Sequence, residues 1–206
     1  SIILTTTTAF GEGGPYSNKV GFDGVAQAMS GAMHLTGDPD SPMKSSVAYV
    51  DYATASLSAF STMAALYEVK NGGKGQLVET SLLSTALTIS SGSITEQAQT
   101  RPNRVASGNR AQSAGPADCY QTKDGWIMVQ LIGPHMFKRW TQLVDAPELL
   151  SDVRFKDDLS RGENGAILSD IMSSWCSQFT TEEALVELEK LKIPVGESKS
   201  VRVKPL

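Results

Sequence analysis

Residues 46–60, SVAYVDYATASLSAF, place a single acid, Asp51, among small and apolar residues. An ionised carboxylate in such surroundings can attack an acyl carbon and form a covalent intermediate. The same position also suits a simpler role. A helix is expected from Tyr52 to Lys70, and aspartate is a favoured N-cap, so the spacing alone favours a helix cap over a nucleophile. The two roles are compatible, because the positive end of the helix dipole would keep the carboxylate ionised in either case.

A glycine-rich stretch, FGEGGPY at residues 10–16, is the second candidate site. Gly11, Gly13 and Gly14 would allow the backbone to approach a ligand closely. Their spacing differs from the G-x-G-x-x-G dinucleotide fingerprint, and the pattern by itself favours an ordinary turn. The segment GGKGQ at residues 72–76 is interpreted in the same way, as the stop of a helix before a strand.

Three arginines, Arg101, Arg104 and Arg110, lie in the polar segment TRPNRVASGNRAQSAGPA. They could bind phosphate groups, but solvated side chains are the commoner outcome of such a pattern. The composition changes at this segment, which contains glycine and proline. We therefore expect a connector at residues 101–117 between a first domain at 1–100 and a second domain at 118–206.

The composition argues against several classes of protein. The net charge of −4 and the pI near 5.2 argue against a nucleic-acid-binding surface. Cys119 and Cys176 have no C-x-x-C spacing, and His34 and His135 stand alone, so neither a disulfide framework nor a metal site is expected. The sequence has no signal-peptide pattern and no apolar run that could span a membrane. Reduced thiols in a cytoplasmic protein are the default expectation.

The pattern of apolar residues predicts an α/β protein with a mainly parallel sheet in its first half. The second half begins with a hairpin around an Asp124-Gly125 turn. Thr180 or Thr181 is expected to cap the last helix, with Glu183 in its first turn. The three tryptophans are assigned to the core of the second domain. The expected elements are strands at 1–8 and 76–81, a helix that begins at 22 and closes at Gly37, helices at 52–70, 82–99, 134–144, 164–176 and 181–191, and the hairpin at 118–131.

Several segments taken together resemble family III CoA-transferases, the CaiB/BaiF family. They are TAFGEGGPYSNKVGFDGVAQAMSGAMHLTG, VAYVDYATASLSAFSTMAALYEVKNGGKGQLVETSLL, PADCYQTKDGWIMVQL and the late IPVGES. The resemblance covers essentially the whole chain, and the motifs are specific in combination. It implies a partial Rossmann-like large domain, a smaller α+β domain and an interlocked homodimer. It also implies that the chain lacks the family's N-terminal part and its closing C-terminal segment.

The resemblance implies a role for Asp51, which matches the family's nucleophilic aspartate in the D-Y step before a long helix. Asp51 would attack an acyl-CoA thioester, pass through a mixed anhydride and an aspartyl-CoA thioester, and deliver CoA to a small carboxylic acid. Coenzyme A would then be a substrate, with no permanently bound cofactor. Neither nucleic acid nor a membrane is expected as a partner, and the location would be cytoplasmic.

The same resemblance assigns weaker binding roles to other residues. Gly11, Gly13, Gly14 and Tyr16 would shape the CoA pocket. Thr8 stands where formyl-CoA transferase has a lysine for the CoA phosphates, and we expect Thr8 to lie in the CoA site.

Gly108 and Gln112 fall where that enzyme has a mobile glycine-rich loop over its active site. Only one glycine remains in SGNRAQ, which together with Thr8 argues against a formyl-CoA transferase.

Two alternatives follow from the same family. The racemases carry a histidine in a G-x-D step, and this chain has Phe22 there, which cannot move a proton. We therefore favour a transferase over a racemase or isomerase. A truncated member that only binds CoA or dimerises is the second alternative.

Overall fold

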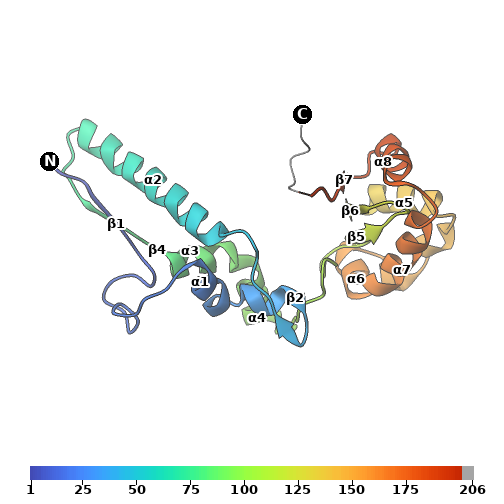
Figure 1. Ribbon diagram of the computed structural model, residues 1–206, viewed down its shortest axis with the longest axis horizontal. Helices are drawn as coiled ribbons and strands as arrows, with labels where there is room; N and C mark the ends of the chain where they lie inside the picture. The colour runs from blue at the N-terminus through green and yellow to red at the C-terminus, as the bar shows by residue number, and fades with distance from the viewer. Residues whose placement is uncertain (201–206) are drawn as a thin grey trace. The chain divides into compact units, whose positions relative to one another are not determined.

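The computed structural model describes residues 1–200 and divides the chain into two compact units (Figure 1). The first unit is Ser1–Gly108, and the second begins at Asn109. The division falls inside the segment 101–117. Within the described residues, no helix is both long and apolar enough to cross a membrane.

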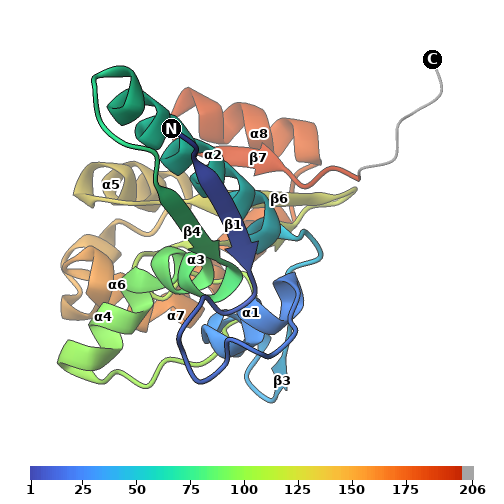
Figure 2. The same cartoon turned by 90° about the vertical axis from the view of Figure 1, so that its left-hand side faces the viewer.

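The first unit consists of a two-stranded sheet with helices packed against it. The strands β1 and β4 fall within the two predicted strand segments and pair in parallel, as predicted for the sheet. The structure adds the register, with Leu4 opposite Leu77 and Thr8 opposite Ser81. The long helix α2 lies along this sheet, as Figure 2 shows. The elements are β1 (Leu4–Thr8), α1 (Asp23–Met29), η1 (Ala32–Leu35), β2 (Gly37–Asp38), β3 (Ser41–Pro42), α2 (Tyr49–Lys70), β4 (Leu77–Ser81), α3 (Leu82–Ile89) and α4 (Ser91–Thr100).

Hydroxyl groups join α2 to the sheet. The Thr5 and Thr62 hydroxyl oxygens lie 2.7 Å apart, and the Ser58 hydroxyl lies 2.7 Å from that of Thr80. The aromatic side chains of α2 point away from this contact, because Phe60 is 74% and Tyr67 is 71% exposed. The sheet-facing side of α2 is therefore its polar, small-residue side.

Three details of the first unit differ from the prediction. The first helix is shorter, because Gly31 adopts a left-handed φ of 85° and starts the separate 3-10 turn η1. Residues 37–46, where no strand was predicted, contain the short hairpin β2–β3. The expected helix 82–99 breaks at Ser90 into α3 and α4. Such breaks depend on local backbone geometry that apolar spacing does not report.

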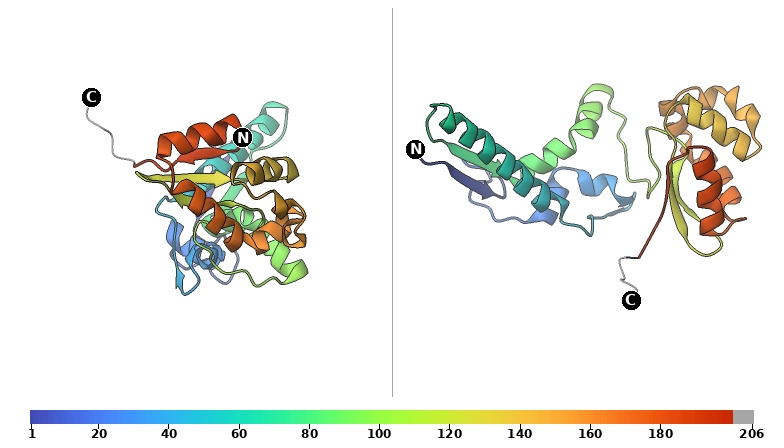
Figure 3. Two further views of the ribbon diagram at one scale, coloured as in Figure 1. Left: turned by 90° about the vertical axis from the view of Figure 1, so that its right-hand side faces the viewer. Right: turned by 90° about the horizontal axis from the view of Figure 1, so that it is seen from above.

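The second unit is an antiparallel sheet of order β5-β6-β7 packed with helices (Figure 3). The predicted hairpin is present, since Gln121 pairs with Trp126 across the Asp124-Gly125 turn. Thr180 caps α8 in a reciprocal capping box with Glu183. The elements are β5 (Ala117–Gln121), β6 (Trp126–Gln130), α5 (Pro134–Leu143), η2 (Pro147–Leu150), η3 (Val153–Phe155), α6 (Asp158–Glu163), α7 (Gly165–Cys176), α8 (Thr181–Lys190) and β7 (Val195–Glu197).

The core of the second unit contains two of the three tryptophans. Trp140 is 0% and Trp175 is 8% exposed, but Trp126 is 47% exposed. The core assignment of Trp126 is therefore wrong, because this residue begins β6 beside the turn, where the sheet is open to solvent. Both thiols are free, with Cys176 buried and Cys119 half-buried.

Candidate active site

The candidate nucleophile Asp51 lies inside the first turn of α2. The helix begins at Tyr49, three residues earlier than expected, and its N-cap position is Ala48. The cap interpretation of Asp51 is therefore wrong. Asp51 is exposed, and its carboxylate accepts no hydrogen bond from any of the described residues.

The cap of α2 comes from a distant residue, Asp23, the first residue of α1. Its Oδ2 atom accepts hydrogen bonds from the main-chain N–H of Val50 at 2.8 Å and of Asp51 at 3.1 Å. Asp23 is buried, with 8% of its surface exposed. Asp23 is not among the site residues predicted from the sequence. Its only sequence signal is its place in the G-F-D step, directly after Phe22.

A second buried side chain holds Asp23 in place. The Gln27 side-chain amide, one helical turn along α1, donates to Asp23 Oδ1. The Gln27 Oε1 atom accepts the main-chain N–H of Ser45 at 2.9 Å. The segment that enters α2 is thus tied to α1, and Gln27 is only 1% exposed.

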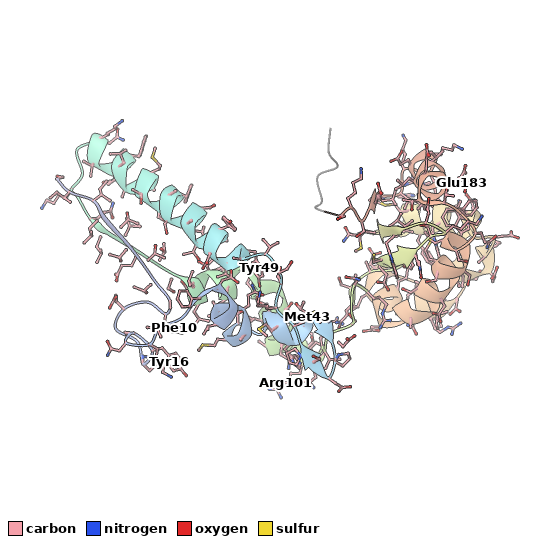
Figure 4. The ribbon with its side chains drawn as sticks, viewed as in Figure 1. Phe10, Tyr16, Met43, Tyr49, Arg101 and Glu183 are labelled. Atoms are coloured by element: carbon pink, nitrogen blue, oxygen red, sulfur yellow. The ribbon has the colours of Figure 1, made fainter. Side chains whose placement is uncertain are left out.

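The surroundings of this network are apolar on one side and open on the other. A small core of Ala26, Val50 and Ala86 packs beneath the start of α2, with Tyr49 against it. Figure 4 labels Tyr49 at this end of the helix. Burial, and then the charge of Asp23, raise the pKa of the Tyr49 phenol. Phe22, which directly precedes Asp23 in the chain, is 79% exposed.

A cavity of about 350 Å³ lies at the end of the parallel strands, where the glycine-rich loop begins. Thr8 and Gly11 line it, and the Thr8 hydroxyl accepts the Gly11 N–H at 2.9 Å. Gly11 has a φ of 82°, which a side chain would strain. Glu12 and Glu79 also line the cavity, so its walls carry negative charge.

The other predicted residues of this loop are Gly13, Gly14 and Tyr16. Tyr16 packs against Phe10 with ring centroids 5.8 Å apart, as Figure 4 allows the reader to follow, and Lys19 Nζ lies 4.3 Å from the Tyr16 ring centroid. Gly13 and Gly14 have open space where a side chain would begin. Phe10 lines the cavity of Thr8 and Gly11, but Gly13, Gly14 and Tyr16 are not among its lining residues.

The two predicted loop residues belong to different units. Gly108 has a φ of 65°, and its N–H donates to the carbonyl of Gly37 at 2.8 Å in the first unit. Gln112 belongs to the second unit, where its backbone packs against Gly162.

One of the three connector arginines, Arg104, forms an ion pair with a carboxylate of the first unit. Arg104 forms a two-pronged pair with Glu96, with Nε–Oε2 and Nη2–Oε1 distances of 2.8 and 2.7 Å. The Arg104 hydrogen bond holds the pKa of the Glu96 carboxyl below its usual value. The pair lines a second cavity of about 470 Å³, to which His34 also contributes. Among the described residues, no group of three or more His, Cys, Asp or Glu is placed to hold a metal ion.

Comparison with known proteins identifies the family. The sequence model described as CoA-transferase family III matches residues 1–203. The chain belongs to CoA-transferase family III. This finding confirms the resemblance to the family that the sequence motifs indicated.

Named relatives of this family III chain are CoA-transferases. The chain is 30% identical to succinyl-CoA–D-citramalate CoA-transferase of Chloroflexus aurantiacus, over 95% of this chain and 49% of that protein. It is also 30% identical to succinyl-CoA:glutarate CoA-transferase of Homo sapiens, over 95% of this chain and 45% of that protein. The chain thus spans about half the length of these relatives.

Solved structures support the α/β fold of the family III chain. A CaiB/BaiF family protein from Brucella suis is 28% identical and superposes with a TM-score of 0.76, over 97% of this chain and 53% of that one. Rv3272 from Mycobacterium tuberculosis superposes with a TM-score of 0.80 at 22% identity, over 97% of this chain and 53% of that one, which supports the fold alone.

Proposed function

We propose that the protein containing this chain is a CoA-transferase that moves CoA from an acyl-CoA donor to a small carboxylic acid, with Asp51 as covalent nucleophile. One observation carries the proposal beyond family membership. The Asp51 carboxylate is exposed in the first turn of α2, and the main-chain donors beside it are occupied by Asp23. A carboxylate without such donors keeps its lone pairs available for attack.

The proposed reaction needs no oxidant or external base. An Asp51 oxygen attacks the thioester carbonyl carbon, the C–S bond breaks, and CoA leaves as a thiolate. The thiolate attacks the Asp51 carbonyl carbon of the resulting anhydride, which releases the donor acid and leaves an aspartyl-CoA thioester. The acceptor carboxylate repeats these two steps in reverse order, so CoA ends on the acceptor and Asp51 is regenerated. Splitting the transfer in this way keeps the energy of the thioester.

The acceptor is proposed to be a small carboxylic acid, and dicarboxylic acids are the first to test. The relatives above carry names that pair succinyl-CoA with D-citramalate or glutarate. Thr8 and Gly11, with Gly13, Gly14 and Tyr16 in the same loop, stay proposals for the CoA site. Gly108 and Gln112 stay proposals for a covering loop. The homodimer and the cytoplasmic location are likewise proposals.

A racemase remains the alternative reaction, and Phe22 argues against it. Racemisation requires a proton donor and an acceptor on opposite faces of the α-carbon. The aromatic ring of Phe22 is exposed beside Asp23 and offers neither. Exchange of deuterium from solvent into the α-carbon of a branched acyl-CoA would favour the racemase instead.

The test is to trap the covalent intermediate on the full-length protein. The protein is incubated with succinyl-CoA, treated with hydroxylamine, digested, and analysed by mass spectrometry for modification of Asp51. Asp51→Asn should abolish both the adduct and CoA transfer. Asp40→Asn, which changes an exposed aspartate in the turn between β2 and β3, is the matched control and should retain both.

Two results would count against the proposal. Full transfer activity in Asp51→Asn would remove the nucleophile role. A wild-type protein that binds CoA but transfers it to no acid of a broad panel would favour the non-catalytic alternative.

A further inference from the structure

The start of α2 uses its main-chain donors in an unusual way. The first N–H groups of a helix have no partner within the helix and need one from outside. Here Tyr49 N donates to Val47 O at 2.9 Å, while Val50 and Asp51 donate to the carboxylate of Asp23. The donors next to the Asp51 side chain are therefore already bonded.

This arrangement decides where the Asp51 carboxylate can go. An aspartate near a helix start commonly bends back to accept from the first N–H groups. Because one oxygen of Asp23 accepts from both Val50 and Asp51, that conformation is closed to Asp51. We propose that Asp23 is a positioning residue that leaves the Asp51 carboxylate unbound and directed outward for attack.

The proposal rests on the proposed function and adds a physical role to it. Hydrogen bonds to a carboxylate stabilise its charged form and weaken it as an electron donor. If Asp23 were absent, the freed N–H groups would bind Asp51 in its resting state.

The buried partner of Asp23 makes the arrangement rigid. Gln27 donates to Asp23 Oδ1 and accepts from the N–H of Ser45, so one amide links α1 to the segment that leads into α2. Because Asp23 and Gln27 are both buried, solvent does not compete with these bonds. Asp23 touches no reacting atom in this scheme and acts through Asp51 alone.

The test compares Asp23→Ala and Asp23→Asn with the wild type, using the protein as its gene encodes it. The measurements are the thermal midpoint, KM for succinyl-CoA, kcat, and the single-turnover rate at which the trapped adduct on Asp51 forms. Asp157→Asn is the matched control, because Asp157 caps α6 in the second unit by accepting from Ser160 N at 2.8 Å. It should leave all the kinetic values unchanged.

We expect Asp23→Ala to lower kcat and the adduct rate together by roughly tenfold or more, with KM changed by less than about twofold. Asp23→Asn, which keeps a neutral acceptor, should fall between Asp23→Ala and the wild type. A purely structural cap would lower the thermal midpoint without slowing adduct formation in the folded fraction, and that result would overturn the proposal.

Two further outcomes separate this inference from the proposed function. If Asp23→Ala does not fold, a folded Asp23→Asn that forms the adduct at the wild-type rate overturns the inference alone. If wild-type protein transfers CoA with no adduct on Asp51, the proposed nucleophile fails and the inference fails with it.

Discussion

Replacing Trp140 by alanine should destabilise the second unit far more than the same change at Trp126. Trp140 is 0% exposed and stacks on Phe137 at a centroid distance of 5.6 Å. Its indole N–H donates to the sulfur of Met172 at 3.1 Å. Trp126, which begins β6 in the same unit, is the matched control, because it is the same residue type with 47% of its surface exposed.

The expected magnitudes follow from burial. Removing a fully buried tryptophan loses its transfer free energy and leaves a cavity, which together cost about 3–5 kcal/mol. Replacing the half-exposed Trp126 loses only about half of this transfer free energy and leaves no enclosed cavity. The expected loss of unfolding free energy is therefore about 1–2 kcal/mol. The difference between the two variants should therefore be about 2 kcal/mol or more.

The assay is urea unfolding followed by far-UV circular dichroism, which does not depend on tryptophan emission. The slope of unfolding free energy against urea must match between variants for the comparison to hold. Equal losses of unfolding free energy at the two positions would refute the reasoning. They would mean that the surroundings of Trp140 collapse around the missing ring or that Trp126 is buried.

Two further predictions concern titratable groups in the second unit. Burial raises the pKa of the Asp158 carboxyl, but the hydrogen bonds from Arg161 and the Gly133 N–H lower it further, to below its ordinary 3.8. Between the two pKa values, the unfolded protein binds more protons at Asp158 than the folded protein does. The stabilisation by Asp158 is therefore complete at pH values above its pKa in the unfolded protein, and it is lost as the pH falls through its lower pKa in the folded protein. In urea unfolding from about pH 6 to about pH 2, the advantage of wild type over Asp158→Asn should shrink with falling pH; a constant advantage would contradict this. Burial raises the pKa of the Cys176 thiol to about 12. The pKa of the Cys119 thiol is also raised, first by burial and second by the nearby charge of Asp118. Iodoacetamide at about pH 8 should therefore label Cys176 only in urea, as peptide mass mapping would reveal, and rapid labelling of native Cys176 would contradict it.

The sequence by itself determined the elements whose signals are local. The parallel pair β1 and β4, the hairpin at Asp124-Gly125 and the capping box of Thr180 and Glu183 all appear where the sequence predicted them. The hairpin turn and the capping box depend on residues within a few positions of one another, and the two strands are each marked by their own β-branched and apolar residues. The parallel pairing of the strands follows from the alternation of strands and helices along the chain. The family was also readable from the sequence, because its motifs are specific in combination.

Only the tertiary structure decided which aspartate caps the start of α2. Local spacing favoured Asp51 as the cap, yet the cap is Asp23, 28 positions earlier in the chain. Local spacing points to Asp51 alone, and the cap by Asp23 depends on how α1 packs against α2 and on the link from Gln27 to Ser45. The exposure of Trp126 was decided in the same way, because burial depends on which elements cover a strand. Hydrogen bonds and burial between distant segments arise from packing, which no local pattern encodes.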